Sequence, residues 1–290
     1  MKAADKRFEL VQPVVLGEQE FERLGKYIMS QFGIKMPSHK KIFLQNRLHK
    51  RLRDLNINDF KAYTDFVFSP GGQKEELANM IDAVCTNKTD FFREPVHFSF
   101  LLSQGLGDYT ARTGKKDISI WSAGCSSGEE PYTIAMIIKE YSRTNPYFDF
   151  RILATDISNS VLQHAAIGIY NSDKIDAIPA NFHARYLQKG TGSYEHKFRI
   201  SSDIRNRVVF QKLNLLEKDY KGIGKSDIIF CRNVLIYFER EIQYRILSQL
   251  CQHLSAGGYL FLGHSETITG LDLPLIHIKP TIYMKADRQT

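Results

Sequence analysis

The sequence has little cysteine: four residues among 290, with no C-x-x-C pair and no Cys/His cluster. This argues against a disulfide framework or a zinc site, and we expect all four residues to be reduced thiols in a cytoplasmic protein. No stretch approaches about 18 uninterrupted apolar residues, so we expect no transmembrane helix. The N-terminus carries acidic residues throughout and lacks an apolar stretch of signal-peptide length, so export is not indicated. The four thiols are Cys85, Cys125, Cys231 and Cys251.

The composition is that of a globular protein, with 43% apolar and 24% charged residues, which argues against a disordered, collagen-like or coiled-coil chain. The charge is spread unevenly. Of the net +7 (39 basic minus 32 acidic residues), +5 lies in residues 1–70, which hold 13 Lys and Arg against 8 Asp and Glu. Seven basic residues and no acidic residue lie between Lys35 and Arg53. Such a field favours an acidic partner: nucleic acid, an anionic membrane or an acidic protein surface.

The first part of the chain has a helical pattern. Four leucines recur at helical spacing, at Leu44, Leu48, Leu52 and Leu55. Further amphipathic segments are expected over residues 18–30, 58–68 and 73–84. We therefore predict an N-terminal helical bundle domain over residues 1–90, with residues 1–15 flexible.

From residue 117 the pattern changes to alternating strands and helices. Strands are predicted over 118–123, 150–156, 208–213, 227–233, 257–264 and 281–285, and helices over 131–141, from 159, and over 240–254. This alternation predicts a parallel α/β sheet with helices on both faces, in a second domain over residues 91–290. Residues 170–206 break the alternation and predict a small antiparallel β insertion.

A turn rich in glycine and serine follows the first predicted strand, with the sequence W-S-A-G-C-S-S-G-E-E-P-Y at 121–132. Glycines at a strand-to-helix turn let a ligand approach the backbone, and the helix N-terminus offers unpaired N–H groups. The spacing is not the dinucleotide-binding G-x-G-x-x-G, and the acids Glu129 and Glu130 would repel a pyrophosphate. They suit a ligand with cationic and hydroxyl groups, which favours S-adenosylmethionine over NAD.

Asp156 lies at the carboxyl end of the second predicted strand. A carboxylate there can accept hydrogen bonds from both ribose hydroxyls of an adenosine-type ligand. The alternative is a helix N-cap, because a helix is expected to begin shortly after it. Taken alone, the two interpretations weigh evenly, whereas together with the preceding turn the ligand interpretation is favoured.

Six motifs in a fixed order carry a resemblance that spans nearly the whole chain. They are Asn87-x-Thr89-x-Phe91-Phe92-Arg93-Glu94, the turn at 121–132, Ala154-Thr155-Asp156-Ile157, Asn214-Leu215-Leu216, F-C-R-N-V-L-I-Y-F at 230–238, and Gly263-His264-Ser265-Glu266. Together they resemble the chemotaxis receptor methyltransferase family, CheR. The resemblance implies an N-terminal helical domain, a Rossmann-like class I methyltransferase domain with a small three-stranded insertion, and methyl transfer from S-adenosylmethionine to receptor glutamates.

The resemblance also implies which residues bind the cofactor and its product, S-adenosylhomocysteine. The turn supplies Gly124 and Glu130, with Glu130 facing the ammonium group, and Asp156 faces the ribose. The other implied positions are Asn87, Thr89, Arg93, Asn214, Leu215, Arg232 and Asn233. Two alternatives stay open: Arg93 and Glu94 could form a helix-terminal ion pair, and Glu129 could be a solvated first-turn acid.

The implied reaction does not depend on a strong general base. A glutamate side chain is already ionised at neutral pH, with an ordinary pKa of about 4.3. The enzyme must instead supply proximity and in-line geometry, worth up to about 7–11 kcal/mol. The resemblance points to Arg93 and Tyr237 as the groups that hold the carboxylate, although Tyr237 lies in an apolar run where a tyrosine usually packs. No metal is needed, and the sequence shows no metal-ligand cluster.

The basic segment has two interpretations: docking of acidic receptor helices by charge complementarity, or a solvated helix face. Seven basic residues without an acidic one favour docking, and the absence of a recognised binding motif argues against nucleic acid. We expect a monomer that meets the cytoplasmic domains of methyl-accepting receptors without membrane insertion. A receptor tail could pair with the hairpin at 190–192. The docking candidates are Lys40, Lys41, Arg47, Lys50, Arg51 and Arg53.

Two other functions compete with receptor methylation. The net positive charge also suits a methyltransferase that acts on RNA or a small molecule. A non-catalytic adaptor that senses the cofactor is the third hypothesis. The presence of Arg93 and Tyr237 beside a complete set of cofactor positions argues against the adaptor, since a sensor would not need the substrate-facing pair.

Overall fold

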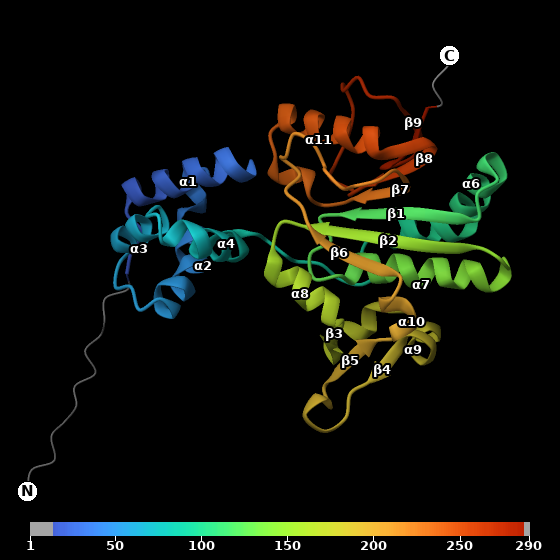
Figure 1. The fold of residues 1–290 in the computed structure, drawn as a ribbon, viewed down its shortest axis with the longest axis horizontal. Coiled ribbons are helices and arrows are strands. Elements are labelled where there is room, and N and C mark those ends of the chain that lie inside the picture. Colours follow the sequence, from blue (N-terminus) through green and yellow to red (C-terminus); the bar gives the residue numbers. More distant parts are fainter. Residues whose placement is uncertain (1–13, 287–290) are drawn as a thin grey trace, which may run out of the picture. The chain divides into compact units, whose positions relative to one another are not determined.

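The computed structural model describes residues 14–286, apart from the side chain of residue 74. Residues 1–13, which hold most of the stretch expected to be flexible, lie outside the described residues. The chain forms two compact units (Figure 1). One comprises residues up to 30 together with 36–84, and the other comprises 31–35 together with residues from 85 onward.

The first unit is a helical bundle, as the leucine spacing predicts. Its elements are α1 (Glu18–Phe32), the 3-10 turn η1 (Ser38–Lys40), α2 (Lys41–Asp54), α3 (Phe60–Val67) and α4 (Gly72–Val84). The expected leucine stripe of α2 is buried at Leu44, Leu48 and Leu52. Helix α3 begins where the carboxylate of Asp59 accepts a 2.7 Å hydrogen bond from the backbone N–H of Ala62, which satisfies one of the unpaired first-turn groups.

The second unit is built on a seven-stranded sheet with the strand order β6-β2-β1-β7-β8-β10-β9. The first five strands in that order are parallel, and β10 and β9 are antiparallel. The bounds are β1 (Asp117–Ala123), β2 (Asp149–Asp156), β6 (Val208–Lys212), β7 (Ser226–Cys231), β8 (Leu254–Leu262), β9 (Leu275–Lys279) and β10 (Ile282–Lys285). A mostly parallel, Rossmann-like sheet was predicted, and this fold class is confirmed.

The predicted insertion is a separate three-stranded antiparallel sheet. Its strands are β3 (Ile169–Asn171), β4 (Leu187–Lys189) and β5 (Lys197–Ile200), with β5 between the other two. The 3-10 turns η3 (Ser172–Ala177) and η4 (Gly192–Tyr194) and the helices α9 (Ala180–Tyr186) and α10 (Ser202–Arg205) belong to the same region. Strands β3 and β4 are therefore the edges at which a further strand could pair.

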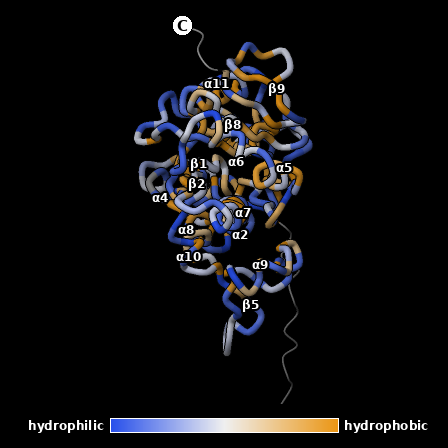
Figure 2. Tube along the Cα trace, turned by 90° about the vertical axis from the view of Figure 1, so that its right-hand side faces the viewer, coloured by the Kyte–Doolittle hydropathy of each residue, from blue (hydrophilic) through white to orange (hydrophobic). Residues whose placement is uncertain are grey.

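Helices cover both faces of the main sheet, with α7 and α8 on one side and α11 on the other (Figure 1). Helix α5 (Pro95–Phe100) continues through a π-helical turn (Leu101–Gly105) into α6 (Leu106–Thr113). The other helices of this unit are α7 (Glu129–Thr144), α8 (Asn159–Ile167) and α11 (Arg240–His253). A 3-10 turn, η5 (Leu235–Tyr237), follows β7. Apolar segments, orange in Figure 2, concentrate around β1, β8 and α7.

Successive side chains of a strand point to opposite faces of the sheet, which explains why this unit has two apolar cores, one on each face. In β1, Ile118 and Ile120 belong to one apolar cluster, whereas Trp121 and Ala123 belong to the other. The alternation anchors each strand from both sides, so the polar residues that follow β1, β2 and β7 are held at one edge of the sheet. Among the described residues, no helix combines the length and the apolar character needed to cross a membrane.

Candidate functional site

The turn after β1 is a sharp bend that a side chain at Gly124 would prevent. Gly124 has a φ of 83°, and a Cβ added there would lie 2.4 Å from Cγ2 of Val234. The backbone N–H groups of Gly124 and Cys125 both donate to the carbonyl oxygen of Thr155, at 2.7 and 2.9 Å. The bend therefore brings the chain between the ends of β2 and β7, with its backbone close to both.

Asp156 ends β2 and fixes this turn. Its Oδ2 accepts a 2.8 Å hydrogen bond from the N–H of Ser126, and its Oδ1 accepts a 3.0 Å bond from the N–H of Ser158. The N-cap of α8 is Ser158, whose hydroxyl accepts from the N–H of Val161 at 3.3 Å, so the N-cap interpretation of Asp156 is wrong. Both oxygens of Asp156 therefore bind backbone N–H groups, which fixes the carboxylate at the end of β2.

The two acids at the start of α7 have different surroundings. Glu130 accepts a 2.7 Å hydrogen bond from the hydroxyl of Ser122, and its Oε2 lies 3.6 Å from Nε of Arg232. Burial raises the pKa of Glu130, and the positive charge of Arg232 opposes that shift. Glu129 is 0% exposed and forms an ion pair with Lys174 of the insertion. The interpretation of Glu129 as a solvated acid is therefore wrong, because it ties η3 to the turn.

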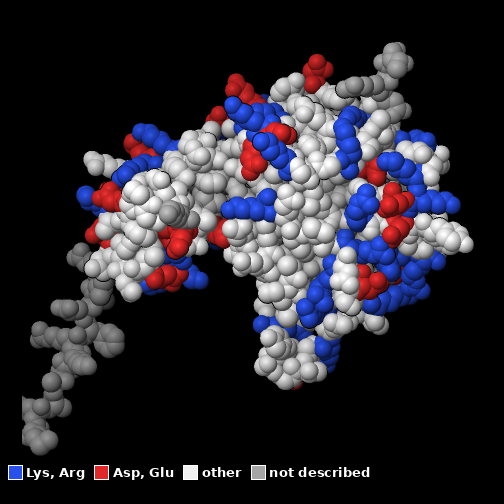
Figure 3. Space-filling model, viewed as in Figure 1, with Lys and Arg blue, Asp and Glu red and all other residues white. Residues whose placement is uncertain are grey.

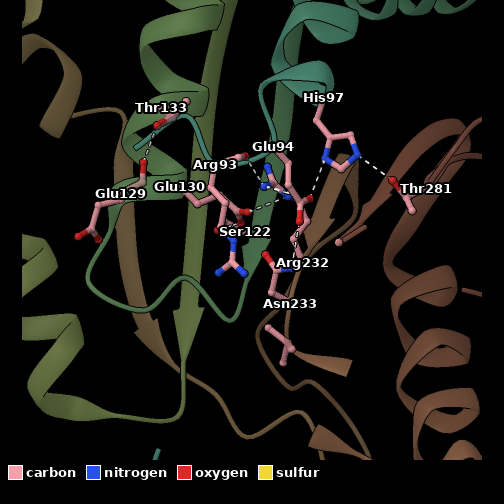
Figure 4. A network of polar contacts seen from close by, with 12 residues as sticks. Arg93, Glu94, His97, Ser122, Glu129, Glu130, Thr133, Arg232, Asn233 and Thr281 are labelled. Atoms are coloured by element: carbon pink, nitrogen blue, oxygen red, sulfur yellow. Dashed lines mark hydrogen bonds and ion pairs between the residues drawn. The ribbon is translucent and has the colours of Figure 1, made fainter. Parts of the chain in front are cut away.

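Arg232 follows β7 and lies at the centre of the polar network in Figure 4. Its Nη2 lies 3.3 Å from Oε2 of Glu94 and also donates to the backbone carbonyl of Arg93. The guanidinium carbon sits 5.2 Å from the ring centroid of Phe98. Within the described part of the chain, Nε and Nη1 of this buried side chain have no hydrogen-bond partner. Two such N–H groups can receive an anionic ligand group, such as a carboxylate.

Glu94 begins α5 with a φ of 58° and joins three distant segments. Its Oε1 accepts from Nδ2 of Asn233 at 3.1 Å and from the backbone N–H of His264 at 3.2 Å. Burial would raise the pKa of Glu94, but the Asn233 hydrogen bond and the Arg232 charge outweigh it, and the pKa is below its ordinary value. Arg93 instead donates to the carbonyl of Lys88 at 3.2 Å. The Arg93–Glu94 ion pair considered from the sequence is therefore wrong.

His97, one turn into α5, is buried beside Glu94. Its Nδ1 lies 3.6 Å from Oε2 of Glu94, and its Nε2 contacts the hydroxyl of Thr281 at 2.8 Å (Figure 4). Burial, followed by the charge of Arg232, lowers the pKa of His97 to about 4. The imidazole is therefore neutral near pH 7. No sequence motif pointed to His97, because its contacts depend on residues from the far end of the chain.

The segment that precedes α5 is fastened to the turn and to the insertion. The carbonyl of Asn87 accepts a 3.0 Å hydrogen bond from the hydroxyl of Ser126, and the carbonyl of Thr89 accepts a 3.2 Å bond from Nζ of Lys174. The side chain of Arg93 is exposed. These contacts bring three implied cofactor residues to the same end of the sheet as the turn.

The implied residues after β6 and β7 differ in what they can offer. Asn214 uses its side chain within the chain: Nδ2 donates to the carbonyl of residue 31 at 3.0 Å, and Oδ1 accepts from the N–H of Leu216 at 3.0 Å. Leu215 is buried in the core beside α11. The carbonyl of Asn214 also accepts from the N–H of Glu217 at 2.9 Å, and that of Leu215 from the hydroxyl of Tyr220 at 2.9 Å, so each carbonyl keeps one lone pair for a ligand. Tyr237, in η5, is half-buried, and its hydroxyl has no hydrogen-bond partner within residues 14–286.

Glu266 positions the segment that carries Asn233, a role that no sequence argument assigned. Its buried carboxylate accepts from the backbone N–H groups of Asn233 (3.0 Å), Val234 (2.8 Å), Leu235 (2.7 Å) and Gly263 (2.6 Å). Asn233 has a φ of 60°, so this carboxylate stabilises a bend that its backbone does not favour. The available signal was the motif at 263–266, which drew attention to the resemblance but not to a role.

The basic residues of α2 fall into two groups. Arg51 forms two hydrogen bonds, at 2.9 and 2.7 Å, with the buried carboxylate of Glu76, and Lys41 bonds Glu18 at 2.6 Å. These two cations are engaged inside the first unit. Exposed cations of the helix, in contrast, are Arg47, Lys50 and Arg53, and Lys40 just before it is half-buried.

Basic side chains are not confined to α2. On the face of the second unit drawn in Figure 3, Lys and Arg gather over α9 and α10, with acidic side chains among them. Several of these charges are paired, because Glu140 binds both Arg143 and Arg185, and Lys139 binds Asp203. A paired surface of this kind provides a weaker field than the exposed cations of α2, Arg47, Lys50 and Arg53.

The charges at the sheet edge fit an amino-acid-bearing nucleoside. The carboxylate of Asp156 suits hydroxyl donors, the carboxylate of Glu130 suits an ammonium group, and the unpartnered N–H groups of Arg232 suit a carboxylate. S-adenosylmethionine carries all three groups. The residues present therefore fit this cofactor.

Known proteins show the same combination of domains. Residues 87–284 match the family model described as "CheR methyltransferase, SAM binding domain", and residues 19–85 match "CheR methyltransferase, all-alpha domain". A "Chemotaxis protein methyltransferase" of Borreliella burgdorferi is 40% identical over 272 residues, which cover 92% of this chain and 94% of the relative. One from Escherichia coli is 36% identical over 275 residues, covering 95% and 93%. The similarity extends over both units.

Proposed function

The chain belongs to the CheR methyltransferase family, and from this premise we propose that it transfers a methyl group from S-adenosylmethionine to glutamate side chains on the cytoplasmic helices of chemoreceptors. The observation that carries the proposal is the convergence of Asp156, Glu130 and Arg232 at the end of the parallel sheet. The names of the relatives supply the chemotactic setting. The product would be a glutamate methyl ester.

In this proposal the cofactor lies across the turn at 124–128. Asp156 holds the ribose hydroxyls, Glu130 the ammonium group, and Arg232 the carboxylate of the methionine portion. Gly124 admits the ligand to the backbone, and Asn87, Thr89 and Asn233 complete the wall on the side of α5. Asn214 and Leu215 flank the adenine through their backbone. When bound, S-adenosylmethionine supplies an electrophilic methyl group on a sulfonium.

The chain's own contribution to the reaction is orientation of the incoming carboxylate. A glutamate that is already ionised needs no base, so the residues must hold it in line and exclude water, an effect worth up to about 7–11 kcal/mol. We assign this role to Arg93, whose guanidinium is exposed and makes one hydrogen bond to the chain, and to the hydroxyl of Tyr237. Docking of the receptor would exclude water from the side chains of Arg93 and Tyr237.

Receptor docking is proposed for the exposed cations of α2. Arg47, Lys50 and Arg53 offer the charge complementarity that acidic methylation helices need. Lys41 and Arg51 contribute less, because each already binds a carboxylate of the bundle. Where a receptor carries a flexible tail, the edge strands β3 and β4 of the insertion offer unpaired backbone groups for strand addition. The proposal also includes a cytoplasmic location and a monomeric state.

The direct test is transfer of a labelled methyl group. The full chain is incubated with S-adenosylmethionine labelled in the methyl group and with cytoplasmic fragments of the receptors from the same organism. The expected product is label on the receptor that mild alkali releases, as a glutamate methyl ester requires. Alkali-stable label on RNA or on a small molecule would support the competing methyltransferase hypothesis. Cofactor binding without transfer to any receptor would support the non-catalytic adaptor.

A further inference from the structure

Glu94, His97 and His264 bring three metal-ligating side chains together at the start of α5. Oε2 of Glu94 lies 3.6 Å from Nδ1 of His97 and 3.9 Å from Nε2 of His264. All three donor atoms lie within 4.8 Å of one another. The two imidazole rings stand nearly perpendicular, with centroids 5.4 Å apart. The sequence predicts no such cluster, because the three residues come from segments far apart in the chain.

The hydroxyl of Thr281 contacts the ring nitrogen of His97 that faces away from Glu94. That hydroxyl donates its only hydrogen to the carbonyl of Pro280, at 2.7 Å. It also lies 2.8 Å from Nε2 of His97, so that nitrogen has a partner and Nδ1 is the one left to face another ligand. The His97 side chain is 1% exposed, and Nδ1 has no hydrogen-bond partner among the described residues.

Two buried polar atoms face each other here. Nδ1 of His97 lies 3.6 Å from Oε2 of Glu94, and both atoms lack a hydrogen-bond partner in the described part of the chain. A metal ion between them would give each of them a partner. Arg232 offsets part of the charge on Glu94, with Nη2 at 3.3 Å from the same oxygen, but it is shared with Glu130. Glu94, Glu130 and Arg232 together carry a net charge of about −1, which leaves room for a cation.

We propose that Oε2 of Glu94, Nδ1 of His97 and Nε2 of His264 bind a divalent transition-metal ion such as Zn²⁺. Two imidazoles and one carboxylate suit zinc and its neighbours in the first transition row rather than Mg²⁺ or Ca²⁺, which prefer oxygen ligands. Ligand distances of about 2.0–2.2 Å place the donors of a tetrahedral ion about 3.3 Å apart. The two separations from Glu94, 3.6 and 3.9 Å, exceed this value by about 0.3 and 0.6 Å, and the half-exposed side chain of His264 can move toward the other two ligands.

The surroundings of His97 are those of a metal ligand. A histidine that binds a metal almost always donates its other ring N–H to a fixed acceptor, which sets the tautomer and the ring orientation. Thr281 and the carbonyl of Pro280 provide this relay. None of the three ligands is assigned to the cofactor or the substrate, but Glu94 contacts Arg232 and Asn233, so the metal site adjoins the proposed cofactor site.

Binding is tested by calorimetric titration of the full chain, free of any affinity tag, with Zn²⁺. The expected result is saturation at one equivalent, with Co²⁺ producing visible absorption bands at the same stoichiometry. His264→Ala should weaken binding at least tenfold, and because this side chain is half-exposed the variant should stay folded. The matched control is His277→Ala, which removes an exposed histidine from β9 and should leave the affinity unchanged.

A second pair of variants tests the hydroxyl relay. Thr281→Val keeps the shape of the side chain but removes the acceptor of His97, and loss of such a partner lowers metal affinity about 10–100-fold. Thr281→Ser keeps the hydroxyl and should retain wild-type affinity. Weakened binding in both His264→Ala and Thr281→Val, with retention in the two controls, supports the site. Wild-type affinity in either His264→Ala or Thr281→Val, or no saturation of the wild type, means an adventitious ion only and overturns it.

Discussion

Arg93 is the residue whose proposed chemical role is most easily separated from a structural one. Its side chain is exposed and donates one hydrogen bond, to the carbonyl of Lys88. Replacing it by alanine should therefore change the free energy of unfolding by no more than about 0.5 kcal/mol. The rate of methyl transfer should fall at least about 100-fold, because the acceptor carboxylate loses its positioning group. Initial rates and urea unfolding measure the two effects.

The control for this change is Arg151→Ala, which removes another exposed arginine, on β2, whose partner is the exposed Asp117. We expect normal turnover in that variant. Normal turnover in Arg93→Ala as well would remove Arg93 from the mechanism. A large loss of stability in Arg93→Ala would show that its main role is structural.

Gly124 is a position where the backbone conformation and the neighbouring atoms both disfavour any side chain. Alanine there would have to adopt a φ of 83° with its Cβ 2.4 Å from Cγ2 of Val234. We expect Gly124→Ala to lower the free energy of unfolding by about 1–3 kcal/mol and to weaken S-adenosylhomocysteine binding at least about tenfold. Calorimetric titration and chemical unfolding provide the measurements. The control is Gly107→Ala in α6, where no atom lies near the added methyl group. This variant should bind S-adenosylhomocysteine like the wild type. Unchanged binding in both variants would contradict the proposed location of the ligand.

Single residues show clearly where prediction from sequence ends. Asp156 and Glu130 could be singled out because strand ends and helix starts have local signatures. Glu94 could not be assigned, because its partners Asn233 and His264 lie 139 and 170 residues away in the chain. Glu129 was misjudged for the same reason, since its partner Lys174 belongs to the insertion. A charged residue whose partner is distant in the chain cannot be distinguished, from the sequence, from one that is exposed to solvent.

Among the elements, the junction of α6 with β1 and β7 depends on one buried carboxylate. Asp227 accepts from the hydroxyl of Tyr109, from Nζ of Lys115 at 2.7 Å and from the N–H of Ser119 at 2.9 Å. Asp227→Asn cannot satisfy all three donors. We expect the free energy of unfolding near neutral pH to fall by about 2 kcal/mol, as measured by chemical denaturation.

The same carboxylate predicts how this loss depends on pH. Burial would raise the pKa of Asp227, but the bonds from Lys115, Tyr109 and Ser119 outweigh it, so the folded pKa lies below the ordinary 3.8. The unfolded chain therefore binds this proton more readily, and the stabilisation is complete above the ordinary pKa and lost as the pH falls through the folded value. The difference between wild type and variant should be constant from about pH 7 to 5 and shrink below about pH 4. A difference that is unaffected by acid would contradict the assignment.

Prediction of whole elements succeeds where the pattern is repeated. The five parallel strands each have an apolar run that two cores bury, so their positions could be read from the sequence. Strand β9 escaped prediction, because it is a partly exposed edge strand whose pairing with β10 defines it. Helices α5 and α6 also escaped, since a π-helical turn at 101–105 interrupts the helical period between them.

At the scale of the whole molecule, the distribution of charge is expected to select the partner. The double substitution Arg47→Glu with Lys50→Glu reverses two exposed cations of α2. We expect the KM for a receptor fragment to rise at least about tenfold at low salt, with a smaller effect at high salt because mobile ions screen the contact. The affinity for S-adenosylhomocysteine should not change.

Lys26→Glu in α1 is the matched control, because it also reverses an exposed lysine of the first unit. It should change the KM by much less than the double substitution. The control changes the net charge by −2 and the double substitution by −4, so an effect half as large on the logarithm of the KM would mean that only net charge matters. An unchanged KM in the α2 variant would contradict docking through this helix.

The contacts of Glu94 also bear on how the protein is made. Its carboxylate is placed by His264, which is synthesised 170 residues later. Ribosomes add about 5–20 residues per second, so Glu94 waits roughly 10–30 seconds for that partner. The sheet strands β1 and β2 can pair during translation, but the group of charged residues at their ends is completed only after the segment carrying Glu266 has emerged. A nascent chain can therefore form its first strand pairs before it acquires a place for its ligand.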